Sequence, residues 1–155
     1  MSFHIRGLEA EPFAKLFQLD EAALETLGAR RIVADASDMY PCRIALKRVD
    51  EGEELLLLNH AHQTNPGSPY RSAGPIFVSR SAKTVSYRGE LPPMLLDRLL
   101  SLRAYDSNAF IVDADVAEGG EVVSLIERFL ANPEVSHVDA HFARRGCFAA
   151  RIERA

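Results

Sequence analysis

The chain has 155 residues, of which 47% are hydrophobic and 26% are charged. These proportions are typical of a folded globular protein and exclude a disordered segment or a coiled coil, so we expect one domain spanning residues 1–155. The net charge of −4 argues against a protein that binds nucleic acid by neutralising phosphates. Four arginines cluster near the C-terminus, at positions 144, 145, 151 and 154, and we interpret them as a solvated edge rather than a polyanion site.

Apolar runs such as residues 55–58 are far shorter than the roughly 20 residues that span a bilayer. The N-terminal residues also lack the apolar region of a secretion signal, so we expect a cytoplasmic protein without membrane contact. In a reducing cytoplasm, Cys42 and Cys147 are expected to be thiols rather than a disulfide. Pairing of the two on neighbouring strands stays open.

The first 28 residues are predicted to be helical. Phe13, Leu16 and Phe17 have helical spacing, and Asp20 is a typical N-cap for a second helix that ends at Gly28. Short strands are predicted next, separated by turn-forming residues, at positions 32–34, 40–46, 55–60 and 76–78.

Residues 65–74 are predicted to form a loop, because their prolines and glycines break both helices and strands. Tyr70 and Arg71 lie in this segment. Loops often display functional side chains, so both residues are candidates for ligand contact.

The second half of the chain predicts two helices and four strands. Two prolines at 92–93 precede a stripe of leucines, and two glycines at 119–120 open a longer helix that Pro133 ends. The strands are predicted at residues 102–105, 109–116, 135–142 and 147–152, the last two forming a hairpin. The predicted class is therefore α+β, with a mixed, mainly antiparallel sheet and about three to four helices. No glycine-rich phosphate loop of the nucleotide-binding type is present.

One strand near the C-terminus is the most informative part of the chain. Strand alternation places His137, Asp139 and His141 on one face. Like His60 and His62, which also lie two residues apart, these are side chains of the types that bind metal ions. A hydrogen-bonded or solvent-facing strand gives the same alternation, so we assign no metal.

The two cysteines have different expected roles. Cys147 follows a turn with two arginines, which would favour its nucleophilic thiolate form. Cys42 shares a strand face with Ile44 and Leu46, which predicts a small buried hydrophobic side chain. An unreactive thiol is the simpler interpretation for Cys147 as well.

Several arginines indicate an anion site. Arg43, Arg71 and Arg151 are suited to a carboxylate or phosphate, because a guanidinium group donates paired hydrogen bonds to such groups. Salt bridges to nearby acidic residues are the alternative. The dipeptide His62-Gln63, just before the loop, supplies a candidate general base with an orienting amide.

A set of motifs resembles a family of uncharacterised, single-domain bacterial proteins. The motifs are Tyr40-Pro-Cys-Arg43, the run from Leu56 to Gln63, Pro69-Tyr-Arg71, Val112-Asp-Ala-Asp115, Gly146-Cys-Phe-Ala-Ala-Arg-Ile152 and the opening Met-Ser-Phe-x-Ile-Arg-Gly-Leu. The resemblance implies a domain of unknown function and assigns no reaction. In the family pattern an aromatic residue stands at the position of His60, and a different run stands at residues 142–145. The matched polar residues are Cys42, Arg43, His62, Gln63, Tyr70, Arg71, His141 and Cys147.

We therefore predict a pocket for a small anionic ligand near residues 62–71. The protein is expected to be an enzyme or, alternatively, a ligand-sensing or protein-interaction module without catalysis. The predicted catalytic residues are His62, His141 and Cys147, and the predicted ligand-binding residues are Arg43, Gln63, Tyr70 and Arg71. No nucleic-acid or membrane partner is expected, and the sequence leaves the cofactor and homo-oligomer formation open.

Overall fold

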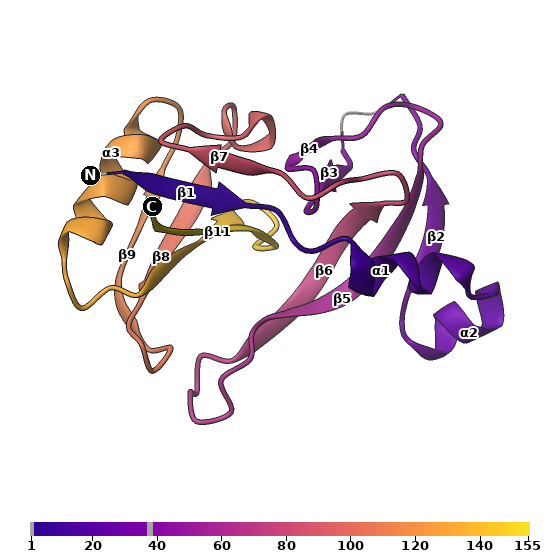
Figure 1. The fold of residues 1–155 in the computed structure, drawn as a ribbon, viewed down its shortest axis with the longest axis horizontal. Coiled ribbons are helices and arrows are strands. Elements are labelled where there is room, and N and C mark those ends of the chain that lie inside the picture. Colours follow the sequence, from indigo (N-terminus) through magenta and orange to yellow (C-terminus); the bar gives the residue numbers. More distant parts are fainter. Residues whose placement is uncertain (1, 37–38) are drawn as a thin grey trace.

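The computed structural model describes residues 2–36 and 39–155, and its strands form two sheets that lie side by side (Figure 1). Strands hold 39% of the residues and helices 18%, so the fold is mainly β rather than a clear α+β fold, although its mixed, mostly antiparallel sheets agree broadly with the prediction. None of the helices in the described residues is long and apolar enough to cross a membrane. The helices and 3-10 turns are α1 (Glu11–Ala14), η1 (Leu16–Gln18), α2 (Glu21–Thr26), η2 (Pro93–Leu95) and α3 (Glu121–Ala131).

The larger sheet, sheet A, has six strands in the order β7-β1-β11-β10-β8-β9, and all of its neighbouring pairs in the described residues are antiparallel. The predicted hairpin of β10 and β11 is confirmed, and Gly146 in its turn has a φ of 80°, which glycine adopts without strain. The strands are β1 (Phe3–Arg6), β7 (Ser86–Arg88), β8 (Leu100–Tyr105), β9 (Ile111–Ala117), β10 (His137–Phe142) and β11 (Phe148–Arg154).

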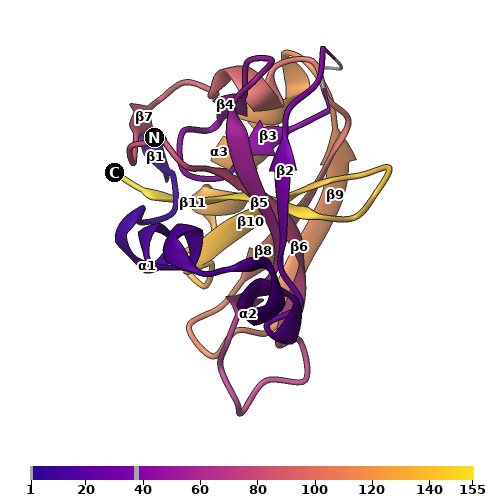
Figure 2. The same cartoon turned by 90° about the vertical axis from the view of Figure 1, so that its right-hand side faces the viewer.

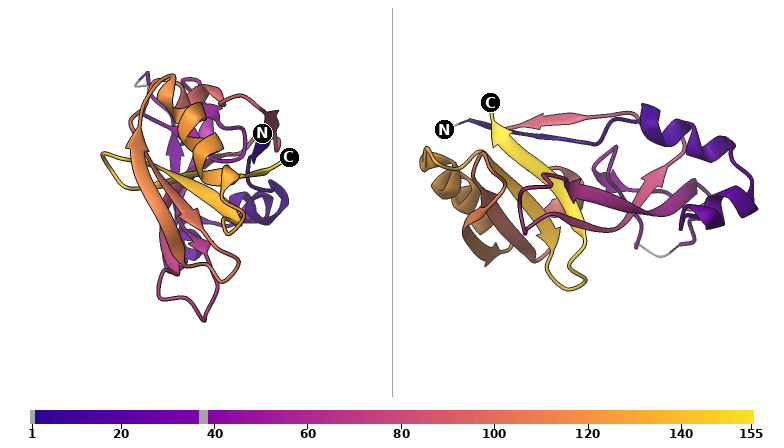
Figure 3. Two further views of the ribbon diagram at one scale, coloured as in Figure 1. Left: turned by 90° about the vertical axis from the view of Figure 1, so that its left-hand side faces the viewer. Right: turned by 90° about the horizontal axis from the view of Figure 1, so that it is seen from below.

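Helix α3 covers one face of sheet A (Figure 3). Its Val122, Ile126 and Phe129 recur at helical spacing and are buried with Val138 and Ile152 of the sheet. This helix is the one predicted after the two glycines, and it carries the chain from β9 across β8 to β10. Because α3 takes the apolar face, the polar residues of these strands lie on the opposite face.

The smaller sheet, sheet B, has five strands in the order β2-β5-β6-β3-β4. Its apolar face packs against the N-terminal helices, so that Phe13, Phe17 and Leu24 share a core with Leu56 and Val78. Strand β3 pairs in parallel with β6, and the other pairs among the described residues are antiparallel. The strands are β2 (Arg30–Val33), β3 (Pro41–Cys42), β4 (Lys47–Arg48), β5 (Glu54–Gln63) and β6 (Ser72–Ser79).

The two sheets meet in two places. Gly7 lies between β1 of sheet A and the helices on sheet B, and a Cβ there would lie 1.9 Å from the carbonyl oxygen of Ile44. Only glycine permits this approach of the two backbones. Strand β5 crosses β10 and β11 (Figure 2), where the ring of His62 stacks on the ring of Phe148 with centroids 5.0 Å apart. This second contact places the polar face of sheet A against the end of β5.

Several predicted elements were wrong. Phe3 and Ile5 lie in a strand rather than a helix, and their alternate burial in the core of sheet A explains why. Residues 43–46 form a turn rather than a strand, with a φ of 52° at Leu46. The helix expected after the two prolines is the single turn η2, and Leu100 already belongs to β8. Part of the predicted loop, from Ser72 onward, extends β6.

Candidate functional site

The polar face of sheet A carries a row of three charged side chains. In the register of the sheet, Arg103 of β8 lies opposite Asp139 of β10, and Asp139 lies opposite Arg151 of β11. Directly opposed residues in a sheet point to the same face, so these side chains are neighbours. One carboxylate therefore lies between two guanidinium groups.

The buried carboxylate of Asp139 is held by Arg151. Nε of Arg151 donates to Oδ1 at 2.8 Å, and Nη2 donates to Oδ2 at 3.0 Å. The same Nη2 donates to the carbonyl oxygen of His62 at 2.8 Å, which ties β5 to sheet A. Arg154 donates to backbone carbonyls at the end of α3. The interpretation of these two arginines as a solvated edge was therefore wrong.

Two predicted catalytic residues, His62 of β5 and His141 of β10, lie against each other in this contact. Their ring centroids are 4.9 Å apart with an interplanar angle of 74°, and both rings contact Phe148. His62 is 9% exposed and His141 is 1% exposed, so both imidazoles are removed from bulk water. Residues 79 positions apart in the sequence thus form one histidine pair.

The histidine pair has unused hydrogen-bonding capacity. Nδ1 of His141 lies 2.9 Å from the carbonyl oxygen of Gly146, and because a carbonyl can only accept, this nitrogen carries the proton. Nε2 of His141 is then a lone-pair acceptor, and neither it nor either ring nitrogen of His62 has a partner among the described residues. Buried polar atoms are normally hydrogen-bonded, so three such nitrogens in one place are an exception to the usual pairing.

Burial keeps the two imidazoles uncharged at neutral pH. Removal from water lowers the pKa of His141 to about 4, although the hydrogen bond to Gly146 acts in the opposite direction, and the positive charge of Arg103 lowers the pKa further. Burial also lowers the pKa of His62, against the opposing effect of Asp139. Each ring therefore has one lone pair that can accept a proton.

Arg103 is the cation of this site that lacks a counter-ion. Within the described part of the chain it forms no ion pair; its Nε contacts Oγ of Ser101 at 3.4 Å, and its side chain also interacts with the hydroxyl of Tyr105. Both oxygens of the adjacent Asp139 are already occupied. With two guanidinium groups, one carboxylate and two neutral imidazoles, the site carries a net positive charge, which favours an anion.

Gln63 and His137 form a supporting network beside the pair. Nε2 of Gln63 lies 3.2 Å from Nε2 of His137, whose ring stacks on Tyr105 with centroids 5.2 Å apart. The pKa of Tyr105 is raised by burial and by the charge of Asp139. These contacts fix the end of β5 on sheet A, so Gln63 is better placed to position His62 than to hold a ligand.

Arg43 and Cys147 lie next to the histidine pair, but Arg43 donates its hydrogen bonds to backbone carbonyls. Arg43 is 3% exposed, and it donates to the carbonyl oxygens of Phe148 at 2.8 Å and Pro41 at 2.7 Å. Burial lowers its pKa to about 10, which leaves it charged at neutral pH. Cys147 is partly exposed at the β10–β11 turn, and both it and Cys42 are free thiols. Arg43 therefore stabilises the start of β11 through the hydrogen bond to Phe148.

Tyr70 and Arg71 lie at the end of the β5–β6 loop, directly before Ser72, which is the sheet partner of Gln63. The ring of Tyr70 meets Phe110 edge to face at 5.7 Å, and Arg71 donates to the carbonyl oxygen of Pro66 at 3.2 Å. Phe77, the partner of Cys42 in the sheet, lies six positions after Arg71, which is about 20 Å of strand. Arg43 and Arg71 thus do not converge on one ligand.

Sequence reasoning missed Arg103, which lies in the predicted strand at 102–105. Alternation alone puts Ser101 and Arg103 on the face opposite the buried Leu102, and this was the available signal. No sequence pattern indicates that this face lies beside Asp139, because the pairing of β8 with β10 joins residues far apart in the chain.

In the described part of the chain, no group of three or more His, Cys, Asp or Glu side chains is close enough to hold a metal ion. The ring of His60 packs between those of Phe13 and Phe148, with centroids 6.2 and 6.1 Å away. An aromatic side chain would suit this position equally well.

Comparison with known proteins shows to which family the chain belongs. The model of a family of unknown function, DUF1203, matches residues 39–154. The chain belongs to this family. No curated protein and no solved structure matches it. All seven predicted site residues lie within the DUF1203 match, as does Arg103, whereas β1 and the N-terminal helices precede it.

Proposed function

We propose that the protein binds a small anionic molecule where β5 crosses sheet A, and that the histidine pair exchanges a proton with it. The observation that carries this proposal is the set of three buried, unpartnered imidazole nitrogens of His62 and His141. Arg103, which has no counter-ion among the described residues, supplies the charge that would hold the anion. The ligand class is the one predicted from the sequence, a small anion. The arginine proposed to bind it is Arg103 instead of Arg43 and Arg71.

The chemistry that suits this arrangement is general acid–base catalysis. Nε2 of His141 has a fixed lone pair, since Nδ1 is engaged by Gly146, and with a pKa of about 4 it is matched to sharing a proton with an acid group of the ligand. His62 can donate or accept, because neither of its nitrogens has a partner in the described part of the chain. The alternative is a sensing module that binds the same anion without converting it.

The proposed setting is the reducing cytoplasm of a bacterium. The free thiols of Cys42 and Cys147 support it, because disulfides form in oxidising compartments and persist there. Small anionic metabolites are abundant substrates for such a protein, and the net charge of −4 leaves nucleic acid an unfavourable partner.

Nuclear magnetic resonance of the imidazole nitrogens tests this proposal directly, because the chain has five histidines and their ring signals can be assigned one by one. Phosphate and malonate serve as probes at pH 7. We expect saturable shifts of the His62 and His141 signals and at least tenfold weaker binding in Arg103→Gln. Arg30→Gln is the matched control, since Arg30 is exposed on β2 in the other sheet.

Shifts of equal size in Arg103→Gln and in the unchanged protein would contradict the assignment of the anion to Arg103. No shift of either histidine with both probes would contradict the site itself. Once a natural ligand is found by mass spectrometry, product formation that is lost in His141→Asn would identify an enzyme. Recovery of the ligand unchanged would identify the sensing module.

A further inference from the structure

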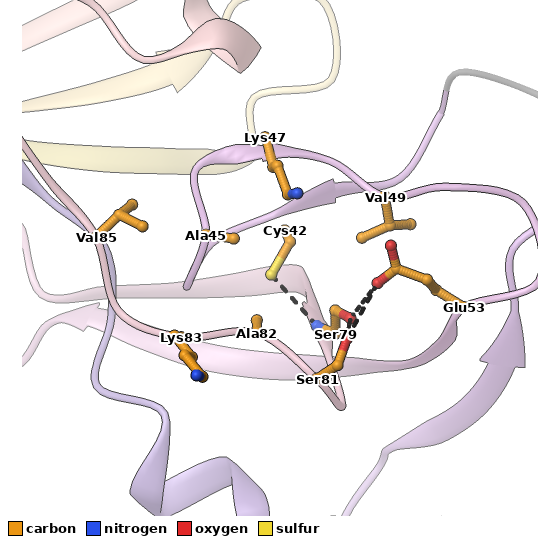
Figure 4. Close-up of a pocket in the computed structure, with 10 residues that line it drawn as sticks. All are labelled: Cys42, Ala45, Lys47, Val49, Glu53, Ser79, Ser81, Ala82, Lys83 and Val85. Atoms are coloured by element: carbon orange, nitrogen blue, oxygen red, sulfur yellow. Dashed lines mark hydrogen bonds between the residues drawn. The ribbon is translucent and has the colours of Figure 1, made fainter.

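A cavity of about 230 Å³ lies beside sheet B, and its polar groups are occupied within the protein (Figure 4). Oε2 of Glu53 accepts from the hydroxyl of Ser79 at 2.7 Å and from that of Ser81 at 3.4 Å. The sulfur of Cys42 is fully buried and accepts from the backbone N–H of Ser79 at 3.3 Å. This cavity therefore leaves little capacity for a ligand, in contrast with the outer edge of sheet A.

Strand β9 is the longest strand at an edge of either sheet in the part of the chain that the structure describes. It has seven residues, against three in β7, four in β2 and two in β4. Val112 and Val116 of β9 are 40% and 53% exposed. An exposed edge of this length presents backbone N–H and C=O groups to which another strand can add.

Two backbone N–H groups of β9 are covered by side chains of the same strand. The N–H of Ala114 donates to Oδ1 of Asp113, and the N–H of Val116 donates to Oδ1 of Asp115, both at 2.8 Å. In an antiparallel ladder, alternate residues bond to the neighbouring strand, and the residues between them direct their backbone groups to the other side. Ala114 and Val116 lie two positions apart and bond to side chains, so their N–H groups are donors of the outer edge. A carboxylate therefore occupies each of these two donors.

Helix α3 holds one of these carboxylates in position. Oδ2 of Asp115 accepts from Nη2 of Arg128 at 3.1 Å, while Oδ1 accepts from the N–H of Val116. The hydrogen bond from Val116 and the one from Arg128 lower the pKa of Asp115, so this carboxyl group is ionised at neutral pH. The side chain of Asp115 thus points toward α3, whereas Val116 lies on the opposite face of the sheet.

We infer that β9 is an edge for pairing with a second copy of this chain, and that the carboxylates of Asp113 and Asp115 hold this edge closed. When two β9 strands are paired antiparallel about a two-fold axis at residue 115, Ala114 lies opposite Val116 of the copy. The covered N–H groups are then the ones that bond across the interface, and the exposed Val116 packs on the copy's Ala114. The carboxylates oppose this pairing twice, because they occupy the donors and because Asp115 faces Asp115 of the copy.

Sedimentation equilibrium of the full chain at pH 7 measures this pairing. We expect Asp113→Ala with Asp115→Ala to self-associate at least about tenfold more tightly than the unchanged protein, because both outer donors are released. Glu127→Ala with Glu134→Ala is the matched control, since it removes the same charge from exposed positions outside β9. Asp113→Asn with Asp115→Asn removes the charge but keeps an oxygen that accepts from the N–H groups, so this variant should self-associate less than the alanine variant.

Two further replacements, each added to the alanine variant, test whether the contact is made by β9. Ala114→Pro removes an outer donor, which an edge strand tolerates, and Val116→Lys places a charge on the edge; each should restore the monomer. Circular dichroism shows whether every variant keeps the fold. An alanine variant as monomeric as the control would overturn the inference, as would self-association that persists with both added replacements. A dimer of the unchanged protein that Ala114→Pro alone dissociates would show that the edge is open. Equal self-association of the asparagine and alanine variants would overturn the role of the hydrogen bonds.

Discussion

The guanidinium group of Arg151 binds both oxygens of Asp139 and, through the same nitrogen Nη2, the carbonyl oxygen of His62 on the other sheet. One ion pair, between a buried carboxylate and a partly buried guanidinium, therefore joins the two sheets at the candidate site. Such a pair is costly to desolvate, so its presence is better explained by what it positions than by a net gain in stability. What it positions is the end of β5, where His62 faces His141.

Replacing Asp139 by Asn should lower the free energy of unfolding by about 3 kcal/mol, because it leaves a partly buried guanidinium without its counter-charge. Urea unfolding at pH 7 measures this change. Glu9→Gln is the matched control, since the pair of Glu9 with Arg6 is exposed and such pairs contribute less than about 1 kcal/mol. A loss in Asp139→Asn no larger than in the control would show that the buried pair does not hold the sheets together.

The stability of the protein should fall as the pH drops from about 6.5 toward 4. The pKa of His141 is about 4 in the folded protein, against an ordinary value of about 6.5 in the unfolded chain. The unfolded state therefore takes up the proton first, and the stability present above pH 6.5 is lost on acidification until the folded ring is also protonated. A difference of about 2.5 pKa units corresponds to about 3 kcal/mol.

The comparison variant for this pH effect is His141→Gln, which removes the titrating ring. Urea unfolding of both proteins at pH 7 and pH 4.5 should show a smaller acid-induced loss in the variant, by about 2 kcal/mol. The carboxylates titrate in both proteins and cancel in the comparison. Identical losses would mean that His141 is hydrated well enough to be protonated in the folded state.

How far the sequence predicts this fold can be seen at two strands. The alternation of His137, Asp139 and His141 was enough to place them on one face of β10. It could not tell that this face is buried against β5, because a solvent-exposed face shows the same alternation. At β1 the local strand signal was weaker still, because the strand has only four residues, of which Phe3 and Ile5 are buried. It pairs with β7 and β11, which are both distant in the chain. Helix signals from residues 13–28 therefore extended too far toward the N-terminus.

The candidate site was predictable in its residue types and not in its assembly. The histidines were identified because few side chains accept a proton near neutral pH. Arg43 was predicted to bind an anion from its neighbours in the sequence, but the turn at residues 43–46 directs it to backbone carbonyls. Arg103 completes the site through pairings between strands, which depend on contacts across the whole chain.

The β5–β6 loop offers a contrast between an exposed and a buried polar residue. Ser68 is fully buried, its hydroxyl donates to the carbonyl oxygen of Ala109 at 2.6 Å, and it accepts from the N–H of Tyr70 at 3.0 Å. Ser68→Ala should lower the melting temperature by about 5 °C, since it leaves two backbone groups unpaired. Arg71→Ala should change it by less than about 2 to 4 °C, because Arg71 is exposed. Calorimetric scans that rank the two variants in the reverse order would assign Arg71 a structural role.

The approach of Gly7 to Ile44 should make this glycine irreplaceable. A Cβ at Gly7 would meet the carbonyl oxygen of Ile44 at 1.9 Å and that of Arg43 at 3.3 Å, and both obstacles are backbone atoms that cannot rotate away. Gly7→Ala should therefore cost about 3 kcal/mol or prevent folding. Gly74→Ala on β6 is the matched control, because a Cβ there meets nothing within 4 Å and should change stability by less than about 0.5 kcal/mol. Urea unfolding measures the stability of both variants, and the soluble yield of each is a second measure. Equal stability of the two variants would mean that β1 and the turn at residues 43–46 can separate without loss of the fold.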